Sequence, residues 1–311
     1  MIISASRRTD IPAFYAPWFF NRLREGYVLV PNPFNPSAIS RVSLNPDVVD
    51  CIVFWTKNPA PMLPRLGELA PYKYYFQFTL NPYGIDVERH LPPLARRIEI
   101  FKRLSDKIGR ERVVWRYDPI LTNEKYDVNF HCEAFDRIAH ALRGYTETCM
   151  LGFIDHYRHI RSALGALGIG ALRRDEIERM AVSFRQSALN ASIALNTCTV
   201  KIDLQHLDIP AGMCIDGRLI GRIAGYTVSA KKDKNQRQIC NCLESIDIGT
   251  YESCLNGCVY CYAIKGSYNT AQYNRRKHEP ESPLMLGHVE EGDVIRDRAM
   301  RSLRSGQRTL F

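Results

Sequence analysis

The sequence predicts an α/β fold built on a parallel sheet, and three observations support this prediction. Short apolar runs rich in aromatic and β-branched residues alternate with longer segments that can form helices. The runs are almost continuously apolar, which is typical of strands covered on both faces. Each run ends in a cluster of polar or turn-forming residues. Functional side chains should therefore gather at the carboxyl ends of the strands.

The expected strands follow one another through the first half of the chain. They are Ile2–Ser6, Cys51–Trp55, Tyr74–Thr79, Val113–Tyr117 and Met150–Ile154. The segments between them are long enough for crossover helices, for example at Ala95–Ile108 and Glu133–Leu142. One edge of the sheet should then collect the polar residues that follow the strands, among them Asn81, Arg116, Asp118, Asp155 and His156.

The net charge of the sequence indicates which class of binding partner to expect. The 311 residues include 42 Lys and Arg against 33 Asp and Glu, a net charge of +9. This excess favours an anionic partner such as nucleic acid, a nucleotide or an acidic redox protein. No apolar run approaches the ~18 residues of a membrane span, and Met1–Arg8 lacks the layout of a signal peptide. We therefore expect a cytoplasmic protein with no membrane partner.

The ten cysteines are unevenly distributed along the chain. Three lie singly in the first half and suit roles as core thiols: Cys51, Cys132 and Cys149. Disulfides are disfavoured in the cytoplasm, so clustered thiols indicate metal ligation. The other seven fall between residues 198 and 261: Cys198, Cys214, Cys240, Cys242, Cys254, Cys258 and Cys261.

The last three cysteines, Cys254, Cys258 and Cys261, form a C-x3-C-x2-C motif with Tyr260 directly before the final cysteine. Three thiolates on one loop can hold three irons of a [4Fe–4S] cluster and leave the fourth iron open. Structural zinc takes four ligands, so zinc is an alternative if Cys240 or Cys242 joins the three.

This motif resembles the signature of the radical S-adenosylmethionine (SAM) superfamily. The block from Tyr251 to Ala263 is most similar to the spore photoproduct lyase branch, whose motif also runs Cys-x-Tyr-Cys-Tyr. The chain as a whole resembles an uncharacterised bacterial family with a radical-SAM-like cysteine cluster at its C-terminus. The resemblance implies a parallel (βα)6 partial TIM-like barrel and a [4Fe–4S] cluster on the three cysteines, with SAM on the open iron. It also implies cleavage of SAM to a 5′-deoxyadenosyl radical that abstracts hydrogen from the substrate.

The position of the motif departs from the superfamily, whose cysteines usually follow the first barrel strand. One interpretation is circular permutation, in which Ser245–Tyr251 supplies the first strand and the five strands listed above complete six. The other is a barrel with a separate ferredoxin-like appendage. We divide the chain into a barrel core (1–197), a cysteine-rich iron–sulfur region that completes the barrel (198–269) and a basic C-terminal tail (270–311).

The sequence lacks the Gly-Gly-Glu segment that binds the SAM amino group in this superfamily, so other residues are candidates for cofactor binding. Asp10 also suits a helix cap ahead of Pro12. The catalytic candidates are Tyr262 beside the motif, His156 as a titrating group at a strand end, and Cys51, or alternatively Cys149, as a thiol that donates hydrogen to a radical. The cofactor candidates are Arg8, Asp10, Asn81, Arg116, Asp118 and Tyr260.

Four further cysteines match the number of ligands of a second, fully ligated [4Fe–4S] cluster. They are Cys198, Cys214, Cys240 and Cys242, and the pair Cys240-Asn241-Cys242 suits metal ligation. The alternative is that Cys198 and Cys214 act as small buried hydrophobic residues.

The final residues, Gln307–Phe311, resemble the Gln-x-x-Leu-Phe peptide by which bacterial repair proteins dock on the sliding clamp. A tail that packs Leu310 and Phe311 on the barrel is the alternative. The lyase resemblance, the positive charge and this peptide together favour repair of DNA lesions, with flavodoxin or ferredoxin as electron donor. The alternatives are a radical SAM enzyme acting on a small molecule or peptide, a non-catalytic iron–sulfur protein for electron transfer or DNA binding, and a zinc-stabilised binding protein.

Overall fold

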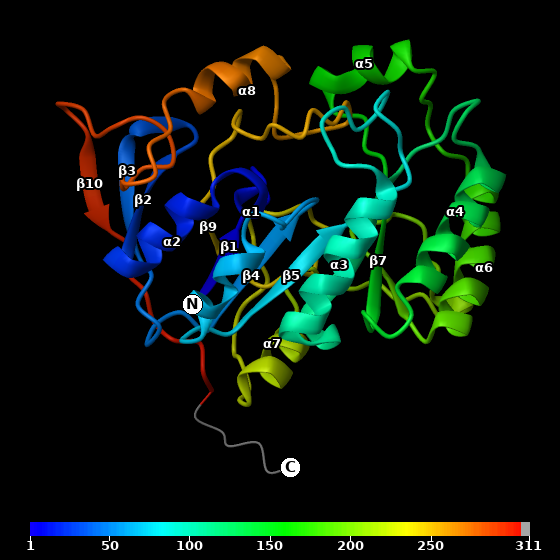
Figure 1. The fold of residues 1–311 in the computed structure, drawn as a ribbon, viewed down its shortest axis with the longest axis horizontal. Coiled ribbons are helices and arrows are strands. Elements are labelled where there is room, and N and C mark those ends of the chain that lie inside the picture. The colour runs from blue at the N-terminus through cyan, green and yellow to red at the C-terminus, as the bar shows by residue number, and fades with distance from the viewer. Residues whose placement is uncertain (306–311) are drawn as a thin grey trace.

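A computed structural model describes residues 1–305 of the chain (Figure 1). Its centre is a seven-stranded sheet in the order β8-β7-β6-β5-β4-β1-β9, and every neighbouring pair is parallel. The α/β prediction is confirmed at this level. The edge strands β8 and β9 do not pair with each other in the described residues, so the sheet is open. Its strands are β1 (Ile2–Ala5), β4 (Cys51–Thr56), β5 (Tyr74–Thr79), β6 (Val113–Ile120), β7 (Thr148–Phe153), β8 (Ala194–Thr197) and β9 (Ile246–Asp247).

The prediction of six strands was one too low, because β8 was missed. Its four residues, Ala-Leu-Asn-Thr, include one buried aliphatic side chain, Leu195, and two exposed or half-buried ones. A strand at the edge of a sheet needs less apolar surface than a central one, so β8 lacks the continuous apolar run that marked the others.

The strand expected at Ser245–Tyr251 is present as the shorter β9, next to β1. Ile246 pairs with Ile3, and Asp247 pairs with Ser4. The Asp247 carboxylate accepts hydrogen bonds from the hydroxyls of Ser4 and Ser6, both at 2.6 Å, and from the backbone N–H of Arg7 at 2.8 Å. These bonds attach β9, which comes late in the sequence, to β1, the first strand of the chain.

The two faces of the sheet pack against different parts of the chain. Alternate strand residues such as Phe54, Phe76 and Trp115 face a core that includes four helices. These are α2 (Ala16–Glu25), α3 (Leu94–Ile108), α4 (Val128–Ala141) and α6 (Arg174–Ala191). The residues between them, such as Val53 and Tyr75, face a second core formed by α7 and the cysteine-rich region. This alternation places the region after β8 on the face that the long helices leave free.

The helices begin and end where the sequence favours it. The expected Ala95–Ile108 is α3 (Leu94–Ile108), and the expected Glu133–Leu142 is α4 (Val128–Ala141), whose N-cap Asp127 accepts from the Phe130 N–H at 2.7 Å. The other helices are α1 (Ile11–Phe14), α2 (Ala16–Glu25), α5 (Arg161–Ala166), α6 (Arg174–Ala191), α7 (Gly217–Ala224) and α8 (Tyr268–Arg275), with 3₁₀ turns at Leu63–Leu69, Arg110–Arg112, Arg158–Ile160 and Gln205–Leu207.

A second, small sheet lies beside α2 (Figure 1). It consists of the hairpin β2 (Tyr27–Asn32) and β3 (Asn35–Ser43), with β10 (Val294–Asp297) parallel to β3. Trp18 of α2 donates its indole N–H to Ser282 O at 3.0 Å. Part of the segment after residue 270 therefore packs on the N-terminal region. The proposed clamp peptide, Gln307–Phe311, lies outside the described residues.

In residues 1–305, no helix is both long enough and apolar enough to cross a membrane.

Candidate functional site

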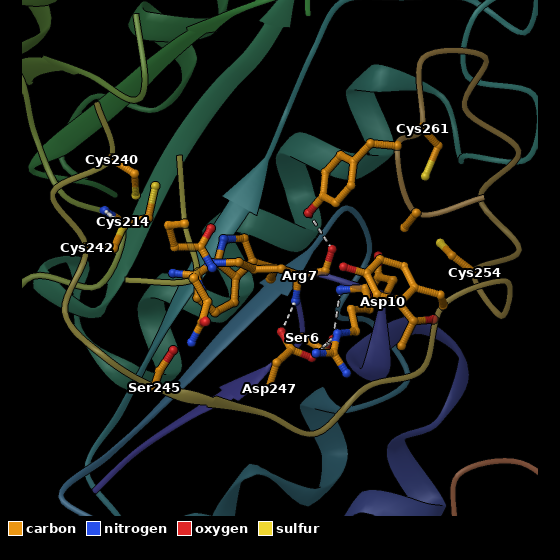
Figure 2. A pocket seen from close by; sticks show the side chains of 18 of the residues that line it. Ser6, Arg7, Asp10, Cys214, Cys240, Cys242, Ser245, Asp247, Cys254 and Cys261 are labelled. Atoms are coloured by element: carbon orange, nitrogen blue, oxygen red, sulfur yellow. Dashed lines mark hydrogen bonds and ion pairs between the residues drawn. The ribbon is translucent and has the colours of Figure 1, made fainter. Parts of the chain in front are cut away.

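The carboxyl ends of the strands surround a cavity of about 850 Å³. It is lined by the segment after β1, Ser6–Asp10, and by residues that end β4, β6 and β7. All seven clustered cysteines also line it, and Figure 2 labels five of them, on two sides of the cavity. Cys254 and Cys261 lie on one side, and Cys214, Cys240 and Cys242 lie on the other. The spacing of the cysteines alone does not indicate that both sets share one cavity.

The loop that carries Cys254, Cys258 and Cys261, called the trio below, is fixed by backbone pairing with the segment after β5. Cys258 forms an antiparallel bridge with Glu88, and the His90 N–H donates to Asn256 O at 3.1 Å. Gly257 has a φ of +65°, and a Cβ there would lie 2.4 Å from the His90 ring. This position therefore requires glycine.

Burial raises the pKa of each trio thiol to about 12. Thiols with this pKa stay protonated at neutral pH unless a metal cation stabilises the thiolate. A bound cation would therefore change the charge state of the whole loop.

Glu88 connects the trio loop to the sheet, and sequence reasoning missed it. Its buried carboxylate accepts from Lys57 Nζ at 2.7 Å and Arg97 Nη1 at 3.1 Å, and it contacts the hydroxyl of Tyr260. Burial alone would raise the pKa of Glu88, but Lys57 and Arg97 hold it below its ordinary value. Glu88 lies in a loop between β5 and α3, where no periodic pattern marks a buried carboxylate. Tyr260, a cofactor candidate, both joins this network and lines the cavity.

Asp10 acts as a connector in the structure. Its carboxylate accepts from Thr56 Oγ1 at 2.7 Å, the Lys57 N–H at 2.8 Å, Asn256 Nδ2 at 3.0 Å and the Ala13 N–H at 3.1 Å. It caps α1, as the sequence allowed, and joins β4 to the trio loop. Burial raises the pKa of Asp10. With four hydrogen bonds already made, this carboxylate has little capacity left for a ligand.

The other four cysteines, called the quartet below, meet at the opposite wall. Cys198 Sγ and Cys214 Sγ are 3.0 Å apart, and Cys242 Sγ accepts the backbone N–H groups of Cys214 at 3.2 Å and Ile215 at 3.5 Å. The neighbouring thiol of Cys214 lowers the pKa of Cys198 to about 7. Hydrogen bonds from Cys214 and Cys240 also lower the pKa of Cys242.

Arg116 and Asp118, both cofactor candidates, lie on the quartet side of the cavity. Arg116 Nη1 is 2.6 Å from Cys214 Sγ, and Nη2 forms an ion pair with Asp118. Burial alone would lower the pKa of Arg116, but Cys214 and Asp118 raise it well above its usual value. A permanently charged guanidinium therefore faces the quartet.

Arg7 occupies the space between the two sets of cysteines (Figure 2). Its guanidinium lies 4.9 Å from the Trp55 ring centroid, and its buried Nη2 has no hydrogen-bond partner among the described residues. Two more cavity-lining atoms, Thr9 Oγ1 and Ser245 Oγ, are also buried without a partner there. Unsatisfied buried polar groups are costly, and these three atoms mark polar groups beside the cavity for which the described residues supply no hydrogen bond.

Two further candidates line the cavity. Arg8 Nη1 donates to Gly249 O at 3.2 Å, and its guanidinium lies 5.0 Å from the Tyr251 ring centroid. Tyr262 donates its hydroxyl to Arg7 O at 2.5 Å. Both side chains are therefore held in place at the cavity wall by the segments after β1 and β9.

Three candidates are not among the residues that line the cavity. Cys51 begins β4, so it lies in the second core at the opposite end of the strand. His156 does not line the cavity, although its neighbours Asp155 and Tyr157 do. Asn81 is buried, and its side-chain amide forms two hydrogen bonds with the backbone of Asp118. It therefore supports a residue that lines the cavity and does not line the cavity itself.

The described residues contain no group of three Cys, His, Asp or Glu side chains arranged to hold a metal ion. A single tetrahedral zinc holds its sulfur ligands about 3.8 Å apart, as follows from Zn–S bonds of about 2.3 Å. A [4Fe–4S] cluster is larger and needs more widely spaced thiolates. The trio fits such a cluster in donor chemistry, because three thiols on one glycine-containing loop line a cavity with unsatisfied polar atoms.

A family model described as "Domain of unknown function (DUF1848)" matches residues 2–263. The chain belongs to this family. The DUF1848 match runs from β1 to just beyond Cys261, so it includes both sets of cysteines and omits α8 and β10. No curated protein and no solved structure matches the chain.

Proposed function

We propose that this DUF1848 protein is a radical SAM enzyme whose catalytic [4Fe–4S] cluster is held by Cys254, Cys258 and Cys261. With SAM bound, such a cluster supplies one-electron cleavage of SAM and a 5′-deoxyadenosyl radical for hydrogen abstraction. The remaining iron site, which has no cysteine ligand, would take the SAM amino and carboxylate groups.

The observation that carries the proposal is the position of β9. In sequence the trio comes near the end of the chain, but in space it follows an edge strand that pairs with β1. Read from that edge, the strands run β9, β1, β4, β5, β6, β7, β8, so the motif follows the first strand. This order supports a circularly permuted version of the arrangement that the resemblance implies, rather than a barrel with a separate appendage.

The chain's own residues would hold and orient the ligands. The Glu88 network and Asp10 fix the trio loop to β4 and β5. Arg7 lines the cavity and would bind a carboxylate or phosphate there, in addition to Asp233, whose carboxylate lies 3.9 Å from Arg7 Nη1, whereas Asp10 already accepts four hydrogen bonds. The aromatic rings of Trp55 and Tyr262 line the cavity and would limit water access to the reacting atoms.

For the substrate we favour nucleic acid, with repair of a DNA lesion by a photoproduct-lyase-like reaction. The cavity volume of about 850 Å³ exceeds what SAM alone requires and leaves room for a base turned out of the helix. Its lining combines aromatic rings with Arg7, Arg8, Arg237 and Arg298, a mixture suited to stacking on bases and pairing with phosphates.

The enzyme proposal is tested by spectroscopy on anaerobically reconstituted protein. The electron paramagnetic resonance signal of the reduced cluster should change when SAM is added, because SAM would bind the open iron. An iron–sulfur protein without SAM chemistry would show no change, which would favour a non-catalytic electron carrier. Colourless protein with stoichiometric zinc would overturn the iron–sulfur assignment altogether.

The substrate proposal is tested by DNA binding at several salt concentrations. Affinity for duplex DNA should fall steeply between about 50 and 200 mM salt. The substitution Arg298→Gln, which changes a cavity-lining residue, should reduce the salt slope by about one. The control Arg174→Gln changes an exposed residue of α6 and should leave the slope unchanged. Binding that is equally weak at all salt concentrations would instead favour a small molecule or peptide.

A further inference from the structure

The quartet gathers four thiols from three separate segments. Cys198 follows β8, Cys214 precedes α7, and the Cys240–Cys242 pair precedes β9. Three of the four are buried, and the fourth, Cys198, is half-buried. The fold thus brings together side chains 16 to 28 positions apart in sequence, as the Cys198–Cys214 and Cys214–Cys242 contacts show. Buried thiols chosen for packing alone have no reason to converge in this way.

The surroundings of the quartet are those of a group that carries negative charge. Arg116 donates to Cys214 Sγ at 2.6 Å, and two backbone N–H groups point at Cys242 Sγ. Hydrogen bonds and positive charge directed at sulfur stabilise metal-bound thiolates and tune their centres. The Arg116 guanidinium is shared between Asp118, its ion-pair partner, and the sulfur of Cys214.

We infer that Cys198, Cys214, Cys240 and Cys242 ligate a second [4Fe–4S] cluster, which forms the wall of the cavity opposite the trio. Four protein ligands leave no iron open for SAM, so this centre would exchange electrons and not bind the cofactor. The Cys198 and Cys214 sulfurs, now 3.0 Å apart, would separate as the cluster is inserted. The inference stands on the quartet alone and does not rest on the proposed function of the trio.

Zinc is the competing occupant, and two features favour iron and sulfide. Structural zinc sites usually draw on C-x2-4-C pairs, whereas Cys240 and Cys242 are separated by a single residue. The quartet also lines the cavity, where a redox centre can exchange electrons with a bound substrate. A structural zinc ion exchanges no electrons, so it has no reason to lie beside a cavity.

The test replaces the trio cysteines in the whole chain and leaves the quartet cysteines in place. A variant with Cys254→Ser, Cys258→Ser and Cys261→Ser should keep about four irons and four sulfides after anaerobic reconstitution. Its reduced spectrum should not respond to SAM. Adding Cys242→Ser should abolish the remaining iron, whereas adding Cys132→Ser, a change in α4 outside both sets, should leave it in place. No iron in the triple variant, or one zinc in its place, would overturn the inference.

A measurement on the unmodified protein guards against variants that fail to fold. Under native conditions, iodoacetamide should label the quartet only after a chelator removes the metal, as mass spectrometry of tryptic peptides would show. Labelling that is the same before and after chelation, or a Cys198–Cys214 disulfide, would contradict a metal centre. If the trio fails to bind SAM while the triple variant still holds iron, the proposed function is wrong and this inference survives.

Discussion

Ser4 and Asp247, 243 positions apart in the sequence, are hydrogen-bonded neighbours in the sheet, with Ser4 Oγ 2.6 Å from the Asp247 carboxylate. The same carboxylate accepts from Ser6, Arg7 and Gly249. Because β9 has only two residues, the hydrogen bonds to this carboxylate provide much of the attachment of β9 to β1. The chain continues from β9 to the trio loop.

Asp247→Ala should lower the free energy of unfolding by about 2–4 kcal/mol, since several charge-assisted hydrogen bonds are lost at once. Urea unfolding monitored by circular dichroism measures this change. Asp297→Ala is the matched control, because that side chain is exposed in β10, and it should shift stability by no more than about 0.5 kcal/mol. Equal effects of the two substitutions would show that Asp247 does not anchor β9.

Glu88→Gln should destabilise the fold by about 3–5 kcal/mol, because it leaves Lys57 and Arg97 partly buried without their counter-ion. The folded pKa of Glu88 lies below its ordinary value of 4.5, so its contribution is present above that pH. It is lost as the pH falls through the folded pKa, and the gap between wild type and variant should narrow on acidification. Glu68→Gln, a change in an exposed ion pair, should alter stability by less than about 1 kcal/mol. A gap that widens toward low pH would contradict the assignment.

His131 predicts a separate pH effect. Burial lowers the pKa of its imidazole to about 4, and the ring bonds the Tyr117 hydroxyl and Leu121 O. Between its ordinary pKa of 6.5 and that value the unfolded chain binds a proton that the folded chain does not. Stability should therefore fall by about 3 kcal/mol as the pH drops across this range. His131→Gln should remove this component, and His140→Gln, an exposed change on the same helix, should retain it.

Gly257→Ala should cost about 1–3 kcal/mol and weaken iron binding, because alanine is strained at a φ of +65° and its Cβ meets His90. Thermal unfolding and iron analysis would measure the two effects. Gly67→Ala is the control, since its φ is not positive and no atom lies within 4 Å of the added Cβ. If both glycine variants behave alike, the loop tolerates a side chain and its geometry is not restricted to glycine.

The parallel strands and long helices could be predicted from the sequence because their apolar periodicity is local. One of the two interpretations of the cysteine motif made Ser245–Tyr251 the first strand of the fold. In the structure only Ile246–Asp247 forms a strand there, paired with β1, and hydrogen bonds to Asp247 replace apolar burial. The β2–β3 hairpin was missed although β2 opens with the apolar run Tyr27–Val30, because Pro31 follows that run directly and β3 is mostly polar.

Site residues could be predicted from the sequence only where the residue type itself indicates the chemistry, as it does for cysteine. The seven cysteines were found by count and spacing, and all seven line one cavity. Glu88 was missed because a buried carboxylate in a loop has no local signature, and only the fold brings Lys57, Arg97 and Tyr260 around it. Cys51 is the first residue of its expected strand, so the rule that functional side chains gather at the carboxyl ends already argued against placing it in the site.

The most direct test of the central claim is production of 5′-deoxyadenosine from SAM by the reduced, anaerobically reconstituted protein. We expect the wild-type chain to form 5′-deoxyadenosine, the Cys258→Ala variant to form none, and the Cys132→Ala variant to form as much as the wild type. A wild-type protein that binds iron but neither cleaves SAM nor shows SAM bound at the open iron would contradict the claim. In that case the trio would hold an electron-transfer or structural cluster.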